Sequence, residues 1–143
     1  PSTCAGETTS AARGCLNKLA QDGVDVAIVE LGDGLLGEYG VMELLRTADI
    51  AACVDAVVLA ASDPVAAWGG ARILEGLELP LSAITGPATD NLAGSERLDA
   101  MLGVAAVNAC RRPQALADVV LAALRAKSTT RTSHKPSYLE ACA

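Results

Sequence analysis

The sequence contains very few aromatic residues, which make up 2% of its 143 residues, and it contains no phenylalanine. A core without aromatic side chains has to be built from alanine, valine, leucine and isoleucine, which suits close-packed helices and buried strands. Hydrophobic residues nevertheless make up 51% of the chain, and charged residues make up 20%. We therefore expect a well-packed folded body rather than a disordered chain.

Metal-binding and disulfide patterns are also absent. Histidine occurs once, at position 134, and the five cysteines include no C-x-x-C pair. A zinc site or a disulfide framework is therefore not expected, and Cys15, Cys53 and Cys110, which stand among apolar residues, are predicted to be buried. The sequence shows no signal peptide and no apolar run long enough to span a membrane, so we expect a reducing, cytoplasmic location.

The formal net charge is −6, with few basic residues available to neutralise phosphates. A body this acidic repels a nucleic acid backbone, so we predict that the protein binds neither DNA nor RNA. The same charge does not exclude a nucleotide, because a local loop and a metal ion decide whether a single small anion is held.

Four apolar runs predict buried strands, and segments with helical character lie between them. The strands are expected at residues 24–31, 55–61, 81–85 and 104–108, and the helices at 10–21, 41–54, 64–77, 91–102 and 113–127, with a break near residues 47–49. In the first run the apolar positions are consecutive, which indicates burial on both faces. This alternation predicts an α/β three-layer sandwich with a mainly parallel sheet of about four strands flanked by helices.

The predicted domain covers residues 1–127, and residues 128–143 have lost any periodicity and are predicted to form a tail. The chain begins at Pro1, without an initiator methionine. We therefore expect it to be the C-terminal part of a larger fold.

The stretch D-V-A-I-V-E-L-G-D-G-L-L-G-E-Y-G, residues 25–40, carries the clearest functional signal. A buried strand that ends in Glu30 would present a carboxylate at the rim of a ligand crevice, where it can hold Mg²⁺ or orient an attacking group. Asp33 is close enough in sequence to assist, and Gly32 and Gly34 allow a ligand to approach the backbone. Alternatively, Glu30 only accepts hydrogen bonds from the glycine loop and shapes it.

The ends of the other strands add further polar groups. Asp63 follows the second strand and precedes Pro64, so it is either a ligand-binding residue or a helix cap. Thr89, Asp90 and Asn91 follow the third strand and could contact a base or a polar substrate, or form a turn with a helix cap. Asn108 ends the fourth strand. No G-x-x-x-x-G-K-[ST] phosphate loop is present.

The segments V-A-I-V-E-L-G-D-G-L-L, D-A-V-V-L-A-A-S-D-P and L-S-A-I-T-G-P resemble three consecutive strands of dethiobiotin-synthetase-like P-loop proteins. The chain also resembles an uncharacterised bacterial group of such proteins, over roughly its first 126 residues. The resemblance implies that Glu30 is the metal-associated acid, that Gly32 and Gly34 lie near the substrate, and that residues 89–91 lie near a base or substrate pocket. The phosphate loop of that family has no counterpart here.

Three functions follow as hypotheses. The first is the C-terminal half of a P-loop-like enzyme, of ligase or kinase type, that binds ATP or GTP with Mg²⁺ and a small polar metabolite. Glu30 and Asp33 would be catalytic, Glu30 would hold the metal, and Gly32, Gly34, Asp63, Thr89, Asp90 and Asn91 would bind the cofactor. The second is a nucleotide-independent amino-acid N-acyltransferase. The third is a non-catalytic module that pairs with another chain, such as a missing N-terminal part, a partner subunit or a second copy.

Overall fold

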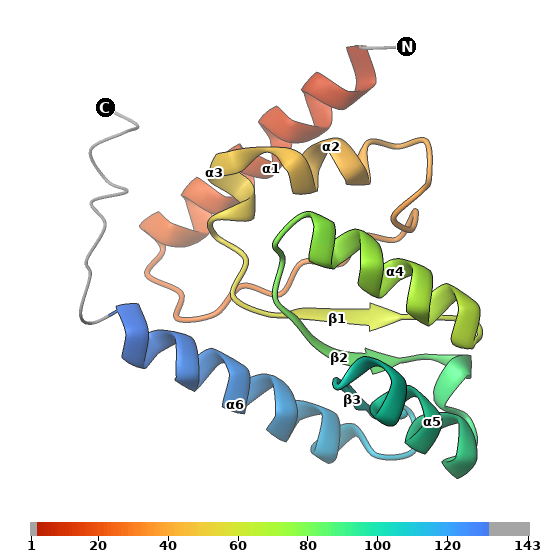
Figure 1. The fold of residues 1–143 in the computed structure, drawn as a ribbon. Coiled ribbons are helices and arrows are strands. Elements are labelled where there is room, and N and C mark those ends of the chain that lie inside the picture. The colour runs from red at the N-terminus through yellow and green to blue at the C-terminus, as the bar shows by residue number, and fades with distance from the viewer. Residues whose placement is uncertain (1–2, 132–143) are drawn as a thin grey trace. The chain divides into compact units, whose positions relative to one another are not determined.

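A computed structural model describes residues 3–131 (Figure 1). Its elements in chain order are α1 (Thr3–Gln21), α2 (Val41–Arg46), α3 (Ala48–Ala51), β1 (Val57–Ala60), α4 (Pro64–Gly76), β2 (Leu81–Thr85), the short 3₁₀ helix η1 (Pro87–Thr89), α5 (Leu92–Leu102), β3 (Ala105–Ala106) and α6 (Pro113–Arg131). Contacts group these elements into two compact units that divide between Val54 and Asp55. The expected α/β class is confirmed.

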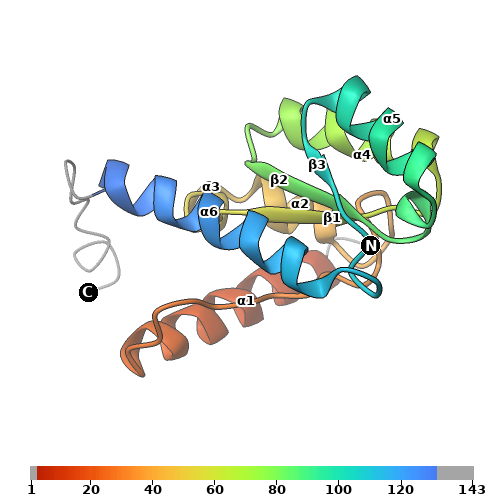
Figure 2. The ribbon, with the colours of Figure 1, turned by 90° about the horizontal axis from the view of Figure 1, so that it is seen from below.

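The C-terminal unit contains a parallel sheet with the strand order β1-β2-β3. Helices α4 and α5 lie on one face of this sheet and α6 lies on the other (Figure 2). The strand predicted at 81–85 has the predicted bounds, whereas β3 covers only two of the five residues predicted for the last strand. The sheet has three strands within residues 3–131, one fewer than expected.

The middle strand, β2, forms the centre of the core. Ala83 and Ile84 are adjacent in sequence and both are completely buried, so both faces of β2 are covered, as in other parallel sheets. Ile84 packs in one cluster with Leu98 of α5 and Ala67 of α4. The core is therefore built from small and aliphatic side chains, as the lack of aromatic residues predicts.

The prediction of a strand at residues 24–31 is wrong. This segment has no strand partner among the described residues, and Figure 1 draws it as a plain trace between α1 and α2. Its large apolar side chains are exposed, Ile28 most of all at 95%. The residue composition favours a strand, but a strand forms only where a neighbouring strand supplies hydrogen bonds, and a composition pattern does not reveal that neighbour.

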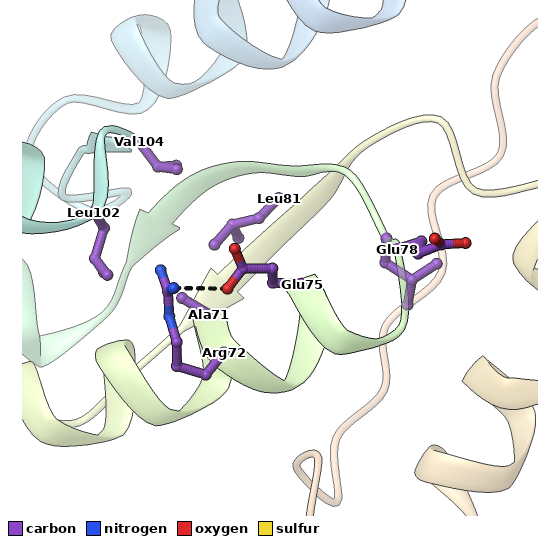
Figure 3. A pocket seen from close by; sticks show the side chains of 8 residues that line it. Ala71, Arg72, Glu75, Glu78, Leu81, Leu102 and Val104 are labelled. Carbon is purple, nitrogen blue, oxygen red and sulfur yellow. Dashed lines mark ion pairs between the residues drawn. The ribbon is translucent and has the colours of Figure 1, made fainter.

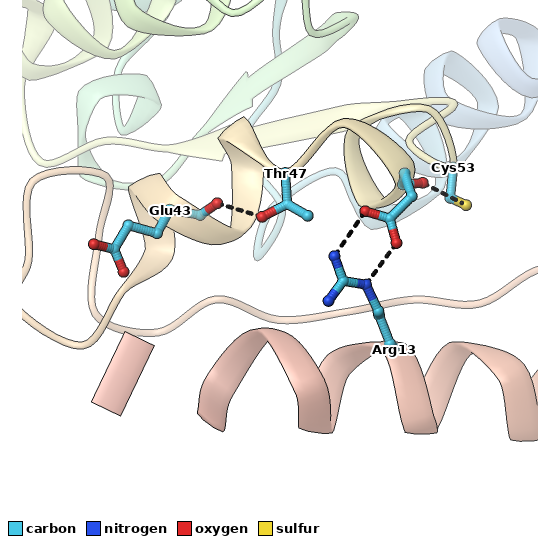
Figure 4. A network of polar contacts seen from close by, with 5 residues as sticks. Arg13, Glu43, Thr47 and Cys53 are labelled. Atoms are coloured by element: carbon cyan, nitrogen blue, oxygen red, sulfur yellow. Dashed lines mark hydrogen bonds and ion pairs between the residues drawn. The ribbon is translucent and has the colours of Figure 1, made fainter. Parts of the chain in front are cut away.

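In the N-terminal unit, the predicted break in the helix at 41–54 is confirmed. Thr47 has an extended backbone, which separates α2 from α3, and its Oγ1 donates to the carbonyl oxygen of Glu43 at 2.8 Å. Arg13 of α1 reaches Asp49 of α3 through two hydrogen bonds, from Nε at 2.6 Å and from Nη2 at 3.0 Å (Figure 4). This ion pair holds the pKa of Asp49 below its usual value.

Two further expectations need correction. Cys15, Cys53 and Cys110 are exposed free thiols, not buried side chains. An apolar neighbour in sequence does not by itself place a side chain in the core. Helix α6 continues to Arg131, so residues 128–131 belong to a helix and not to the predicted tail. The remainder of the predicted tail lies outside the described residues. No helix within residues 3–131 combines the length and the apolar character needed to cross a bilayer.

Candidate functional site

Glu30 does not end a strand. It is exposed, and the residues before it have no ladder partner within the described part of the chain. The geometric premise for Glu30, a carboxylate presented by a buried strand, is therefore wrong. Its proposed role as a metal ligand now depends on the resemblance alone.

Asp33 shapes the glycine loop. Its Oδ2 accepts a hydrogen bond from the backbone N–H of Tyr39 at 2.8 Å. A Cβ atom added at Gly37 would lie 1.9 Å from the same oxygen, and Gly34 has a φ of +77°. Both glycines are therefore needed for the turn that the Asp33 carboxylate closes. Accepting a hydrogen bond from the glycine loop and shaping it, the alternative role given for Glu30, is therefore the role that Asp33 has in the structure.

Asp63 caps α4. Its Oδ1 accepts hydrogen bonds from the backbone N–H groups of Val65 at 2.8 Å and Ala66 at 3.0 Å, and Pro64 occupies the first turn. These bonds, with one from the Ser62 hydroxyl at 2.9 Å, lower the pKa of Asp63, and the bond from Ala66 has the largest effect. Of the two roles predicted for Asp63, the helix cap is confirmed, and ligand binding stays a prediction.

Replacing Asp63 with serine should change the acid sensitivity of the protein. Because the pKa of Asp63 in the folded state is lowered, its charged form stabilises the fold above the unfolded value near 3.8, and this contribution is lost as the pH falls below it. Serine caps without a charge. Thermal unfolding can be followed by circular dichroism from pH 7 to pH 3. The difference in melting temperature between wild type and Asp63→Ser should narrow as the pH falls. A difference that stays constant would contradict the assignment.

The polar residues after β2 are held close to the strand ends. Thr85 ends β2, and its Oγ1 accepts a hydrogen bond from the backbone N–H of Ala109 at 3.0 Å. Thr89, 3% exposed, donates its hydroxyl to the carbonyl oxygen of Gly86 at 2.7 Å. The loop after β2 is therefore tied both to itself and to the segment after β3. This brings two stretches 24 residues apart in sequence to one edge of the sheet.

Asn108 is the centre of the hydrogen-bond network at this edge, and it is 8% exposed. Its Nδ2 donates to Asp90 Oδ1 at 2.9 Å and to the carbonyl oxygen of Thr89 at 3.4 Å. Its Oδ1 accepts from the backbone N–H groups of Cys110 at 3.1 Å and Arg111 at 2.9 Å. The side chain therefore joins the loop after β2 to the loop after β3.

Arg111 adds a positive charge to this edge. Its Nη1 donates to the carbonyl oxygen of Asp90 at 2.6 Å. An amide, a carboxylate and a guanidinium group thus lie together beyond the carboxyl ends of β2 and β3, where open parallel sheets bind their ligands. We name the residues Thr89, Asp90, Asn108 and Arg111 the sheet-edge cluster.

Sequence reasoning identified half of this cluster. Thr89 and Asp90 are predicted site residues, and the structure brings them to the expected edge. Asn91, predicted with them, caps α5 by accepting from the backbone N–H of Gly94 at 2.7 Å, which confirms the predicted alternative of a turn with a helix cap, and its role in ligand binding stays a prediction. Arg111 was missed, and Asn108 was predicted among the polar groups at the strand ends but was given no role there. The available signal was the position of Asn108 directly after a short apolar strand, where a polar side chain is buried beside neighbouring loops.

A metal ion held by protein groups alone does not fit the described residues. Nowhere between residues 3 and 131 do three His, Cys, Asp or Glu side chains gather closely enough to hold one. In the sheet-edge cluster, Asp90 is the only carboxylate, and it accepts from Asn108. Any Mg²⁺ here would need most of its oxygen ligands from water or from a bound phosphate group.

A separate hollow of about 330 Å³ lies at the opposite end of the sheet. It opens beside Leu81, the first residue of β2, and Val104, just before β3, and α4 contributes Arg72 and Glu75 (Figure 3). Arg72 Nη1 and Glu75 Oε2, three residues apart on α4, form an ion pair at 2.6 Å. The hollow lies at the amino-terminal edge of the strands, away from the sheet-edge cluster, so it gives a natural position for control substitutions.

Comparisons of the chain with protein-family models, with curated proteins and with solved structures find no match in any of the three.

Proposed function

We propose that the sheet-edge cluster binds a nucleotide, ATP or GTP, and that the chain is part of a P-loop-like enzyme acting on a small polar metabolite. The observation that carries the proposal is the side-by-side placement of Asp90, Asn108 and Arg111 at the carboxyl edge of β2 and β3. The Asp90 carboxylate can accept a hydrogen bond from a purine base, and the Arg111 guanidinium group favours an anionic ligand. The Asn108 amide holds the two loops that carry these groups. The resemblance to dethiobiotin-synthetase-like proteins supports the same ligand class.

The nucleotide would bring Mg²⁺ with it. Mg²⁺ commonly keeps several water molecules and uses one or two carboxylates together with phosphate oxygens, so no preformed protein cage is required. On the resemblance alone, Glu30 is proposed as a metal ligand, Asp33 as an assisting acid, and Gly32 and Gly34 as a loop beside the substrate. These four residues belong to the N-terminal unit. Because the sequence contains no phosphate loop, the phosphates would be held by a further segment or by a partner subunit.

The proposal predicts a thermal shift with nucleotide. A ligand that binds only the folded state raises the free energy of unfolding by about 2.7 kcal/mol at a concentration one hundred times its Kd. Wild type should therefore melt at a higher temperature with ATP or GTP and Mg²⁺, and the same salts without nucleotide should have no such effect. An unchanged melting temperature with both nucleotides at millimolar concentration would overturn the proposal for this chain.

Two variants locate the site. Arg111→Ala should reduce the nucleotide-induced shift, whereas Arg72→Ala, which removes the same charge at the opposite end of the sheet, should leave the shift unchanged. Equal losses for Arg111→Ala and Arg72→Ala would indicate nonspecific attraction of the anion to positive charge.

A further inference from the structure

The segment at residues 24–31 has the composition of a strand but belongs to no sheet among the described residues. All its side chains are apolar except those of Asp25 and Glu30, and the five large apolar ones are between 36% and 95% exposed. No strand pairs with the segment among the described residues. Contiguous exposed apolar side chains on this scale are typical of an interaction surface.

The sheet of the C-terminal unit offers a complementary feature. Strand β1 lies at one end of the order β1-β2-β3, and its pairing within the described residues is with β2 alone. The N–H groups of Val57 and Ala61 donate to the carbonyl oxygens of Pro80 and Thr85, respectively. Along a strand the backbone groups of alternate residues point to the same side, so those of Leu59 also face β2. The backbone groups of Val58 and Ala60 therefore point outward, and Val58 is 40% exposed. An unpaired edge of this kind is a template for another strand.

We propose that the segment at residues 24–31 of one copy of this chain adds as a parallel strand to the outer edge of β1 in a second copy, and that the exchange is reciprocal. The two surfaces would then complete each other in a closed dimer. Consecutive apolar residues at 26–29 match a strand that is buried on both faces when a dimer forms.

Charge favours β1 over direct pairing of two such segments. Antiparallel pairing about the middle of the segment would place Asp25 opposite Glu30, and parallel pairing in register would place each carboxylate opposite its own copy. Like charges directly opposite each other destabilise a sheet. Strand β1 carries no charge between Val57 and Ala60, and setting residues 26–29 against it places Asp25 and Glu30 opposite alanines 56 and 61.

Analytical ultracentrifugation of matched variants tests the proposal. Wild type should dimerise reversibly, and Ile28→Asp should weaken the dimer by about one hundredfold or more, because an exposed isoleucine that becomes buried is replaced by a charge. Leu36→Asp makes the same change at a side chain that is 80% exposed but lies outside the segment, and it should have little effect. A wild type that is monomeric at all concentrations, or equal losses for both variants, would overturn the proposal.

Mixing distinguishes this mode from direct pairing of the segments. Val58→Asp on β1 should also prevent dimers, and circular dichroism should confirm that both variants are folded. An Ile28→Asp chain still has an intact β1, and a Val58→Asp chain still has an intact segment, so an equimolar mixture restores one of the two contacts. Heterodimers should therefore form where neither variant alone dimerises. If Val58→Asp dimerises like wild type, pairing with β1 is wrong.

Discussion

Gly86→Ala is expected to lower the free energy of unfolding by about 3 kcal/mol or more, through both backbone strain and a steric clash. Gly86 follows β2 with φ +87° and ψ −169°, a backbone conformation that is essentially confined to glycine. A Cβ atom at this position would lie 2.7 Å from the carbonyl oxygen of Ala61 and 3.0 Å from its nitrogen. Thermal or urea unfolding of the variant measures the loss.

Ala61 cannot move aside without further loss. Its N–H donates to the carbonyl oxygen of Thr85 at 3.0 Å, and its own carbonyl oxygen accepts from the N–H of Ala88 at 3.0 Å. These bonds join the residue after β1 to the end of β2 and to the loop that leads to Thr89 and Asp90, so a shift of Ala61 should also weaken nucleotide binding at the sheet-edge cluster.

Gly69→Ala is the matched control for this substitution. Gly69 lies within α4, its φ is not positive, and a Cβ atom added to it meets nothing within 4 Å. Alanine should therefore stabilise the helix by up to about 1 kcal/mol. If Gly86→Ala has the same unfolding midpoint as wild type in temperature or urea, Gly86 does not lie as close to Ala61 as the structure has it.

The sequence predicted elements well where the signal is local. Asp63-Pro64 predicted the start of α4, because a capping carboxylate and a proline act within one helical turn. Leu81–Thr85 was predicted to the residue, since it is short, apolar and bounded by a proline and a glycine. These features depend on neighbours in the chain and need no knowledge of the fold.

Prediction failed where the partner is distant in sequence. Residues 24–31 have the composition of a buried strand, yet no ladder forms around them in the described chain, because hydrogen-bond partners of a strand come from elsewhere in the fold. The same limit explains the sheet-edge cluster. Asp90 and Asn108 stand 18 residues apart, and only the pairing of β2 with β3 brings them together.

Asn108→Ala is expected to cost about 2–4 kcal/mol, the second large effect. The substitution removes the Oδ1 acceptor of the Cys110 and Arg111 N–H groups and the Nδ2 donor to Asp90, at a site that is 8% exposed. A buried backbone N–H group that loses its acceptor destabilises the fold by its full desolvation free energy, because no water molecule replaces the lost partner. Denaturant unfolding measures this loss, and the nucleotide-induced thermal shift should disappear with it.

Asn108→Asp separates the donor function from the acceptor function. Aspartate has nearly the same shape and still accepts from Cys110 and Arg111. It replaces Nδ2, which lies 2.9 Å from Asp90 Oδ1, with a carboxylate oxygen that faces the Asp90 carboxylate. Repulsion should destabilise this variant at neutral pH, and stability should return as the pH falls and one carboxyl group of the pair takes up a proton, because a proton shared between two carboxylates removes the repulsion.

Asn91→Asp makes the same chemical change at a place where it should be harmless. Asn91 caps α5 through its side-chain oxygen, and aspartate caps a helix equally well. Asn108→Asp should therefore be less stable than Asn91→Asp at pH 7, and the difference should narrow toward pH 4. If both variants show the same stability across this range, the Asn108 amide does not donate to Asp90, and the two loops at the sheet edge are held together by other contacts.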